Sequence, residues 1–508
     1  MYADIIIKNG RCVTMCGDGG ADWVAAAGKM ICAAGRGDDW QKLVRPGTQV
    51  IDAKGGTVLP GFIDNHFHVM QTAVNMMSVD LGGARSHREL GEMLAAAEKR
   101  EGAVLGCQVE ESQFEEKRFP DRYVLDKYCS DSPVVLFSKE YHVSMLNTHA
   151  LLYYKVPFSL EGVELDGSGL PTGIFRRNAN YVLRSNVLRS LPDEFRMEAI
   201  HLAMSRLLEN GITTVAAIEG GWLFDDRDAE FIYAHSGEFP VDMPLFYQTM
   251  ELAKVWKLGL RRVGGNIMVD GTLSSHSAAL SAPYADRPDY RGQIFLPQDG
   301  LDEFVQQCYR QDMQLALYSI GDRAIESVLL AHERAIRQGG STALRHRIEH
   351  AIMATPEQIA RAADMKLIFS VQPAYAYLWG GKGGMYESRV GERYLRSNDF
   401  AAMFAAGAVV CGGSDSDVTE PRPMLGIHAA VNRAVPQCAV SVEQAIEMYT
   451  VNGAYALFED KRKGKLAPGY LADIVVLDRD IRAVPAEQLE QTDVTVTIKS
   501  GSVLHSRQ

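Results

Sequence analysis

The sequence lacks the features that mark several large classes of protein. It contains no run of Lys or Arg, and its 52 basic residues are outnumbered by 64 acidic ones, which gives a net charge of −12. Because a phosphate backbone requires a basic face, this balance argues against a nucleic-acid partner. No segment approaches the roughly 20 uninterrupted apolar residues of a membrane span, so we expect no membrane partner either.

Cysteine is sparse and shows no pattern. The eight cysteines are scattered along the chain, and none of them forms a C-x-x-C pair. The opening residues, MYADIIIKNG, lack the basic flank and the long apolar stretch of a signal peptide. These absences predict a cytoplasmic protein whose thiols are reduced.

Apolar residues, by contrast, make up 46% of the 508 residues, which is enough to bury a large core. Both ends of the chain are short β-type runs between glycine turns, and in the first sixty residues this rhythm predicts a small antiparallel sheet. The middle alternates apolar strands with helical stretches. Six strand candidates in the middle lie at 211–219, 264–271, 313–322, 344–351, 366–373 and 407–415. The predicted fold class is α/β, a (β/α)8 TIM-like barrel with a small composite β-sandwich domain formed by both termini.

The same pattern predicts the domain boundaries. Residues 1–57 and 463–508 should form the sandwich, and residues 58–462 should form the barrel. The stretch from about 85 to 178 breaks the alternation of strands and helices, so we expect an insertion over the barrel mouth there.

The strongest chemical signal is the run VLPGFIDNHFHV at 58–69. An apolar strand ends at His66 and His68, whose side chains project on the same side because they are two residues apart. Two imidazoles on one strand face can share a metal ion without rearranging the backbone. The alternative, a pair of hydrogen-bonded core histidines, is disfavoured by the preceding Pro-Gly strand and by the features below.

Polar residues also end three other predicted strands, where barrel enzymes keep their active sites. Asp415 follows an apolar strand in Gly-Ser-Asp, and its carboxylate could complete a metal site and take a proton from the bound water. His350 ends the strand RIEHA (347–351) and could ligate a metal or polarise a substrate oxygen, although a structural histidine is an equal alternative. For Glu219, which ends the strand at 211–219, we expect a solvated carboxylate rather than a catalytic one.

Ten motifs in order resemble the amidohydrolase superfamily, and specifically its YtcJ-like branch (amidohydrolase family 3), which includes N-substituted formamide deformylases. They run nearly from end to end: VLPGFIDNHFH, YHVSMLNTHAL (141–151), GSGLPTGIF (167–175), GITTV (211–215), VDGTLSSHSAAL (269–280), IGDRAI (320–325), RIEHA, SVQP (370–373), GSDSDV (413–418) and GKLAPGYLADIVVLD (464–478). The resemblance implies a barrel with a composite sandwich, a divalent metal cofactor and hydrolysis of a small molecule.

Two departures from the family pattern concern the metal. Members that hold two metals usually carry a carboxylated bridging lysine, where this chain has Asn266, and a strand-end histidine, where this chain has Tyr318. An asparagine cannot form a carbamate, so two ligands of the second metal position are missing together. The resemblance therefore implies about one divalent ion per chain, with zinc expected.

The residues implied to form the site fall into three groups. The expected metal ligands are His66, His68 and Asp415, with water, His276 or His350 completing the shell. The catalytic candidates are Asp415 as proton carrier, His350 and His276 as groups that polarise the scissile carbonyl, and Tyr318 as an oxyanion donor or a filler of the lost metal's space. The substrate-binding candidates are His142, Asp270 and Gln372, although Asp270 could equally hold its strand end, and the aromatic run AYAYLW (374–379) either walls the pocket or packs in the core.

Metal-activated hydrolysis of a C–N bond, in an amide, formamide or cyclic amide, is the leading functional hypothesis. A ring-opening C–C hydrolase of a cyclic diketone, or a single-metal isomerase, stays open because the superfamily includes related activities. A non-catalytic binding protein is the third alternative, against which the intact set of His66, His68 and Asp415 argues. The expected partner is a small-molecule substrate, and a homodimer stays open.

Overall fold

The computed structural model describes residues 2–17, 20–100, 102–139, 141–221 and 225–507. The chain forms two compact units. The first comprises Met1–Phe67, Met204–Ile218 and His235–Gln508, and the second comprises His68–Ala203 and Glu219–Ala234. Within the described ranges, no helix combines the length and the apolar character needed to cross a membrane.

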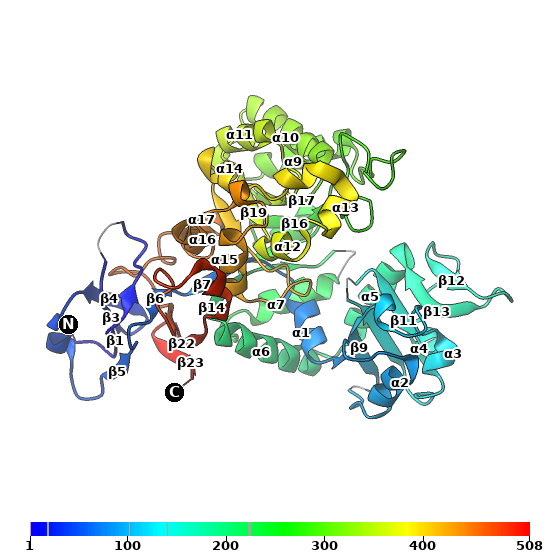
Figure 1. Cartoon of the computed structure of the whole chain (residues 1–508), viewed down its shortest axis with the longest axis horizontal. Coiled ribbons are helices and arrows are strands. Elements are labelled where there is room, and N and C mark those ends of the chain that lie inside the picture. Colours follow the sequence, from blue (N-terminus) through cyan, green and yellow to red (C-terminus); the bar gives the residue numbers. More distant parts are fainter. Residues whose placement is uncertain (1, 18–19, 101, 140, 222–224, 508) are drawn as a thin grey trace. The chain divides into compact units, whose positions relative to one another are not determined.

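An eight-stranded sheet of parallel strands forms a nearly closed barrel (Figure 1). In sheet order its strands are β20 (Val410–Gly412), β19 (Ile368–Val371), β18 (Arg347–His350), β17 (Gln314–Ser319), β16 (Arg262–Met268), β15 (Leu245–Tyr247), β14 (Ile212–Glu219) and β7 (Phe62–Phe67). A parallel bridge between Phe67 and Ser416 links the first strand to the segment that follows the last one. All six strands predicted from the middle of the sequence lie in this sheet, whereas the three-residue β15 was not predicted.

Seven of the eight barrel strands are buried along their whole length, the exception being the partly buried β16, and burial on both faces favours apolar sequences. All eight residues of β14 and all six of β17 are buried. Helices with one apolar face pack outside the strands, and α11 begins with a capping box in which Thr355 and Gln358 satisfy each other's backbone amides. The helices that follow β15 in this unit are α8 (Leu252–Lys257), α9 (Gln298–Arg310), α10 (Asp322–Arg337), α11 (Pro356–Asp364), α12 (Pro373–Trp379), α13 (Met385–Val390), α14 (Phe400–Ala405), α15 (Pro423–Val431), α16 (Val442–Met448) and α17 (Val451–Ala456).

Two smaller sheets bring the chain ends together. One has the order β4 (Met30–Gly35), β3 (Trp23–Ala27), β1 (Ile5–Lys8), β5 (Gln49–Asp52), and the other has the order β2 (Arg11–Cys12), β6 (Thr57–Pro60), β21 (Ile474–Leu477), β22 (Val494–Lys499), β23 (Ser502–Ser506). Ile7, Val58 and Ile498 belong to one buried cluster that both sheets share. The predicted fold class, a barrel with a composite sandwich from both termini, is therefore confirmed.

The pairing within these sheets is less regular than the small antiparallel sheet expected from the sequence. Strands β1 and β5 are parallel, and so are β2 and β6. Between β1 and β5 the chain forms the β3–β4 hairpin and a short helix at Asp39–Leu43. These elements bring the chain back to the start of β1, so β5 runs in the same direction as β1.

The second unit is built on a six-stranded sheet. Its order is β12 (Val163–Leu165), β13 (Pro171–Arg176), β11 (Val143–Leu146), β10 (Val134–Ser138), β9 (Val104–Val109), β8 (Val79–Asp80). Its helices are α1 (Val69–Met76), α2 (His87–Ala95), α3 (Arg122–Leu125), α4 (Thr148–Tyr154), α5 (Arg177–Ser190), the first part of α6 (Asp193–Glu209) and most of α7 (Asp226–His235). The sheet occupies the stretch in which the sequence pattern breaks, and the domain boundaries proposed from that pattern stay a prediction.

Candidate metal centre

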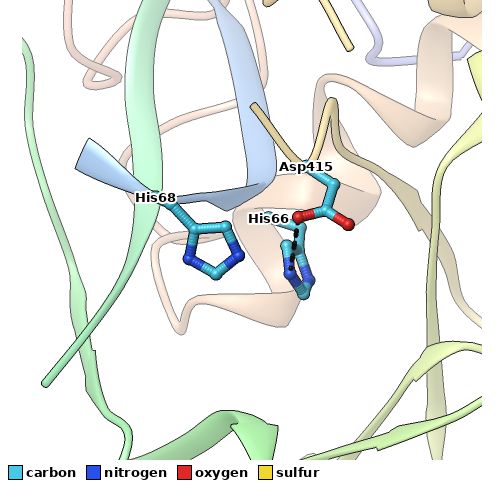
Figure 2. Close-up of side chains that lie close together, drawn as sticks. All are labelled: His66, His68 and Asp415. Carbon is cyan, nitrogen blue, oxygen red and sulfur yellow. Dashed lines mark ion pairs between the residues drawn. The ribbon is translucent and has the colours of Figure 1, made fainter. Parts of the chain in front are cut away.

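Three predicted ligands lie together at the carboxyl ends of the first and last barrel strands. His66 lies near the end of β7, His68 follows that strand directly, and Asp415 follows β20 after Gly413 and Ser414. All three side chains are buried, and one ligand atom from each lies within 4.8 Å of the others. Figure 2 shows the three side chains pointing toward one another, and Nε2 of His66 lies 3.4 Å from Oδ1 of Asp415.

This geometry fits a divalent metal ion. Two ligand atoms that each lie about 2.0–2.1 Å from a tetrahedral ion are about 3.4 Å apart, and Nε2 of His66 and Oδ1 of Asp415 have this separation. Two imidazoles and one carboxylate form the kind of donor set that holds catalytic zinc and leaves one position open. The residues at the site therefore suit the cofactor that the sequence predicts.

The backbone around Asp415 is held against the first strand. Its amide donates to the carbonyl of His66 at 2.8 Å, and its φ of 53° turns the chain back at this point. Asp64 strengthens the link, because its Oδ1 accepts hydrogen bonds from the amides of His66 and Ser414. Gly413 is required for this approach, since a Cβ there would come within 2.6 Å of the His66 nitrogen.

Glu349 orients the ring of His66. Its Oε2 lies 2.6 Å from Nδ1 of His66, and an ionised carboxylate can only accept, so Nδ1 carries the proton and Nε2 presents its lone pair toward Asp415. Burial would raise the pKa of Glu349, but the charge of Arg347 and the hydrogen bond to His66 outweigh it and lower the pKa to about 2. Glu349 is therefore ionised at neutral pH.

Arg347 and Glu349 are the residues of this site that sequence reasoning missed. Arg347 donates to Glu349, to the carbonyl of Asn65 and to Oγ of Ser370, and it is completely buried. A signal was present, because two opposite charges in a strand predicted to be buried must be paired. The motif RIEHA was used for its histidine alone.

Replacing Glu349 with Gln should weaken metal binding tenfold to a hundredfold, the usual effect of losing a carboxylate that supports a metal-binding histidine. The amide keeps the shape of the side chain but removes the charge that stabilises the Nδ1–H form of His66. Titration of metal-stripped protein with Zn²⁺ measures the effect, and Glu333→Gln on α10, whose carboxylate pairs with Arg361, is the matched control. An unchanged dissociation constant would show that Glu349 does not support the site.

His350 lies beside the three-residue group rather than within it. Its ring centroid is 5.0 Å from that of His66 and 4.3 Å from that of Tyr318. Nδ1 of His350 lies 2.6 Å from Oε1 of Gln372, and Nε2 is buried without a hydrogen-bond partner among the described residues. Burial lowers the pKa of His350 to about 4. The ligand role predicted for His350 and the substrate role predicted for Gln372 stay predictions, and the contact observed for Gln372 is with His350.

Two other candidates make contacts of their own. Nε2 of His276 lies 3.0 Å from Asp286, which also accepts a hydrogen bond from Arg389. Asp270 is completely buried and accepts the backbone amides of Ala279, Ile320 and Gly321, which ties its strand end to the next one. The contacts of Asp270 favour the strand-holding alternative that the sequence left open.

Glu219 and His142 lie in the second unit. The expectation that Glu219 is solvated is wrong, because its side chain is completely buried and its Oε1 accepts the amide of Met70, two residues after His68. Burial, together with the nearby negative charge of Asp228, raises the pKa of Glu219 to about 8. Burial and the nearby charge of Arg184 lower the pKa of His142 to about 4, so this candidate substrate residue is neutral.

Comparisons with known proteins identify the family to which the chain belongs. The model of the amidohydrolase family matches residues 49–505. The chain is 27% identical to the putative amidohydrolase YtcJ of Bacillus subtilis, with 92% of each chain covered. It is 26% identical to the N-substituted formamide deformylase of Arthrobacter pascens, with 96% of this chain and 95% of the relative covered.

A solved structure shows the same fold over nearly the whole chain. An uncharacterized metal-dependent hydrolase from Pyrococcus furiosus has a TM-score of 0.79 and 26% identity, and the match covers 94% of this chain and 99% of the other. The family match spans the whole barrel and reaches into both terminal sheets. This chain is therefore a hydrolytic enzyme that belongs to the amidohydrolase family.

Proposed function

We propose that this hydrolase cleaves a C–N bond of a small amide, formamide or cyclic amide, using about one divalent ion held by His66, His68 and Asp415. The buried three-residue group, with its ligand atoms within 4.8 Å of one another, is the observation that carries the proposal. The name of the Arthrobacter relative, an N-substituted formamide deformylase, supports the type of bond. Zinc as the ion and the cytoplasm as the location are part of the proposal, for the reasons given from the sequence.

A divalent ion at this site would lower the pKa of a water molecule toward neutrality and polarise a carbonyl oxygen. Asp415 would accept the proton of that water and deliver it to the leaving nitrogen, so the proton balance closes within the site. The ring of Tyr318 lies next to that of His350. Its hydroxyl would donate a hydrogen bond to the carbonyl oxygen of the substrate, which becomes negative during the attack.

His350 contributes as an acceptor in this proposal. Because Oε1 of Gln372 accepts the proton on Nδ1, a neutral His350 has a lone pair on Nε2. A lone pair accepts a hydrogen bond from water or from a substrate N–H, whereas it cannot polarise a carbonyl oxygen. We therefore prefer this role to the carbonyl-polarising one considered from the sequence.

The proposal is tested by supplying Zn²⁺ to metal-stripped protein and measuring formate released from an N-substituted formamide, and ring opening of a five-membered cyclic amide. We expect hydrolysis of at least one of these substrates that depends on the added metal. The matched control is His66→Ala under the same conditions, which should be inactive with metal present.

Failure to cleave any amide, together with metal-dependent opening of a cyclic 1,3-diketone, would replace the C–N proposal with the C–C alternative. If the metal-stripped protein and His66→Ala hydrolysed the substrate as fast as the metal-loaded wild type, that result would contradict the metal site itself.

A further inference from the structure

The two oxygens of the Asp415 carboxylate contact two different residues. Oδ1 lies 3.4 Å from Nε2 of His66, whereas Oδ2 accepts a hydrogen bond of 2.5 Å from the hydroxyl of Tyr375. This length is typical of a hydroxyl bound to an ionised carboxylate, which is among the stronger hydrogen bonds in proteins. The two oxygens are thus distinguished by their surroundings before any metal is considered.

The rotation of the carboxylate is the remaining freedom of this side chain. The backbone of Asp415 is fixed by its bond to the His66 carbonyl, but the terminal torsion of an aspartate is broad and roughly two-fold. A donor on Oδ2 removes this freedom, because rotation would break the short bond. Tyr375 therefore fixes the plane of the carboxylate, so that one oxygen faces His66 while the other stays on the hydroxyl of Tyr375.

Tyr375 is itself held in place. It lies in the first turn of α12, which begins with Pro373 directly after β19 and Gln372. Its buried ring is stacked on His350, with an angle of 14° between the planes, and meets Trp379 edge-on at 4.7 Å. These contacts fix the direction in which the hydroxyl of Tyr375 donates. The hydrogen bond to Asp415 therefore holds the carboxylate in one orientation.

We propose that Tyr375 is a positioning residue that presents Asp415 to the metal through Oδ1 alone. The proposal rests on the proposed metal site and concerns the geometry of one of its ligands. It also gives a specific role to the aromatic run 374–379, for which the sequence left pocket wall and core packing open. Ligation through one oxygen keeps a coordination position that a carboxylate bound through both oxygens would occupy.

Tyr375→Phe tests the proposal, because it removes the hydroxyl and keeps the ring that packs on His350. We expect Zn²⁺ to bind the metal-stripped variant tenfold to a hundredfold more weakly than the wild type. The Co²⁺-loaded variant should have an altered visible absorption spectrum, which reports the number and arrangement of ligands. Tyr309→Phe is the matched control, since it removes a hydroxyl that bonds Nδ1 of His332 between other helices, and it should leave both measurements unchanged.

A double-mutant cycle with Asp415→Asn separates positioning from general loss of packing. If Tyr375 acts through Asp415, the double variant should bind Zn²⁺ no more weakly than Asp415→Asn alone. Additive losses, or a Tyr375→Phe variant with the wild-type affinity and spectrum, would overturn the proposal. Because these measurements need no substrate, they stand apart from the C–N assay, and unchanged binding in Asp415→Asn would instead refute the metal site.

Discussion

Asp415→Asn is expected to lower turnover at least a few hundredfold, within the usual range for loss of a group that transfers a proton. An amide cannot accept the proton of the attacking water, and it is a weaker metal ligand than a carboxylate. The fold should survive, because Asn has the same shape as Asp and tolerates the left-handed backbone that the φ of 53° requires. The change therefore removes chemistry while keeping the side chain in place.

The measurement compares turnover of the metal-loaded variant with that of the wild type, using the substrate that the amide assay identifies. Asp302→Asn, which changes a carboxylate paired with Arg334 on the outer helices, is the matched control and should keep the wild-type rate. The circular-dichroism melts of the three metal-stripped proteins should coincide, because differences in metal affinity then make no contribution to stability. If Asp415→Asn retained a tenth of the wild-type rate, Asp415 would have no part in proton transfer.

The fold class could be predicted because burial leaves a strong signal in the sequence. Strands such as β14 and β17, buried on both faces, read as continuous apolar runs, and the six strands predicted from such runs all lie in the barrel. Strand β15 was missed because Leu245–Tyr247 is too short to show any period. The parallel pairing of β1 with β5 was missed because strand direction depends on how the intervening chain returns, which local composition does not record.

Only those residues of the candidate site that lie at the ends of predicted strands could be predicted from the sequence. His66, His68 and Asp415 were identified in this way, and the structure brings them together. Two opposite charges in a buried strand indicate that Arg347 and Glu349 are paired, but they do not place Glu349 at the site, since a two-residue period puts Glu349 and His350 on opposite faces of β18. The φ of 70° at His350 breaks that period, so both side chains approach His66. Such a backbone conformation has no reliable signature in the sequence.

Removing the metal is expected to abolish activity, with a loss of at least a hundredfold after dialysis against a strong chelator. One equivalent of Zn²⁺ per chain should restore the rate, because the open position of a three-ligand site supplies the activated water. Elemental analysis of protein purified without chelator gives the count directly. Zero equivalents, with no recovery on addition of Zn²⁺ or Mn²⁺, would contradict the proposed site.

The expected count of about one ion follows from what surrounds the first site. Among the described residues, His66, His68 and Asp415 are the one cluster of three or more metal-ligating side chains. At the second position Tyr318 would have to ionise to bind well, and Asn266 offers only a neutral amide, so a second ion would depend on His350. One imidazole cannot hold a divalent ion against water. Two equivalents by elemental analysis would mean that Glu219, His276 or an ionised Tyr318 supplies the missing ligands, and a count of one in Tyr318→Phe would identify Tyr318 as the one.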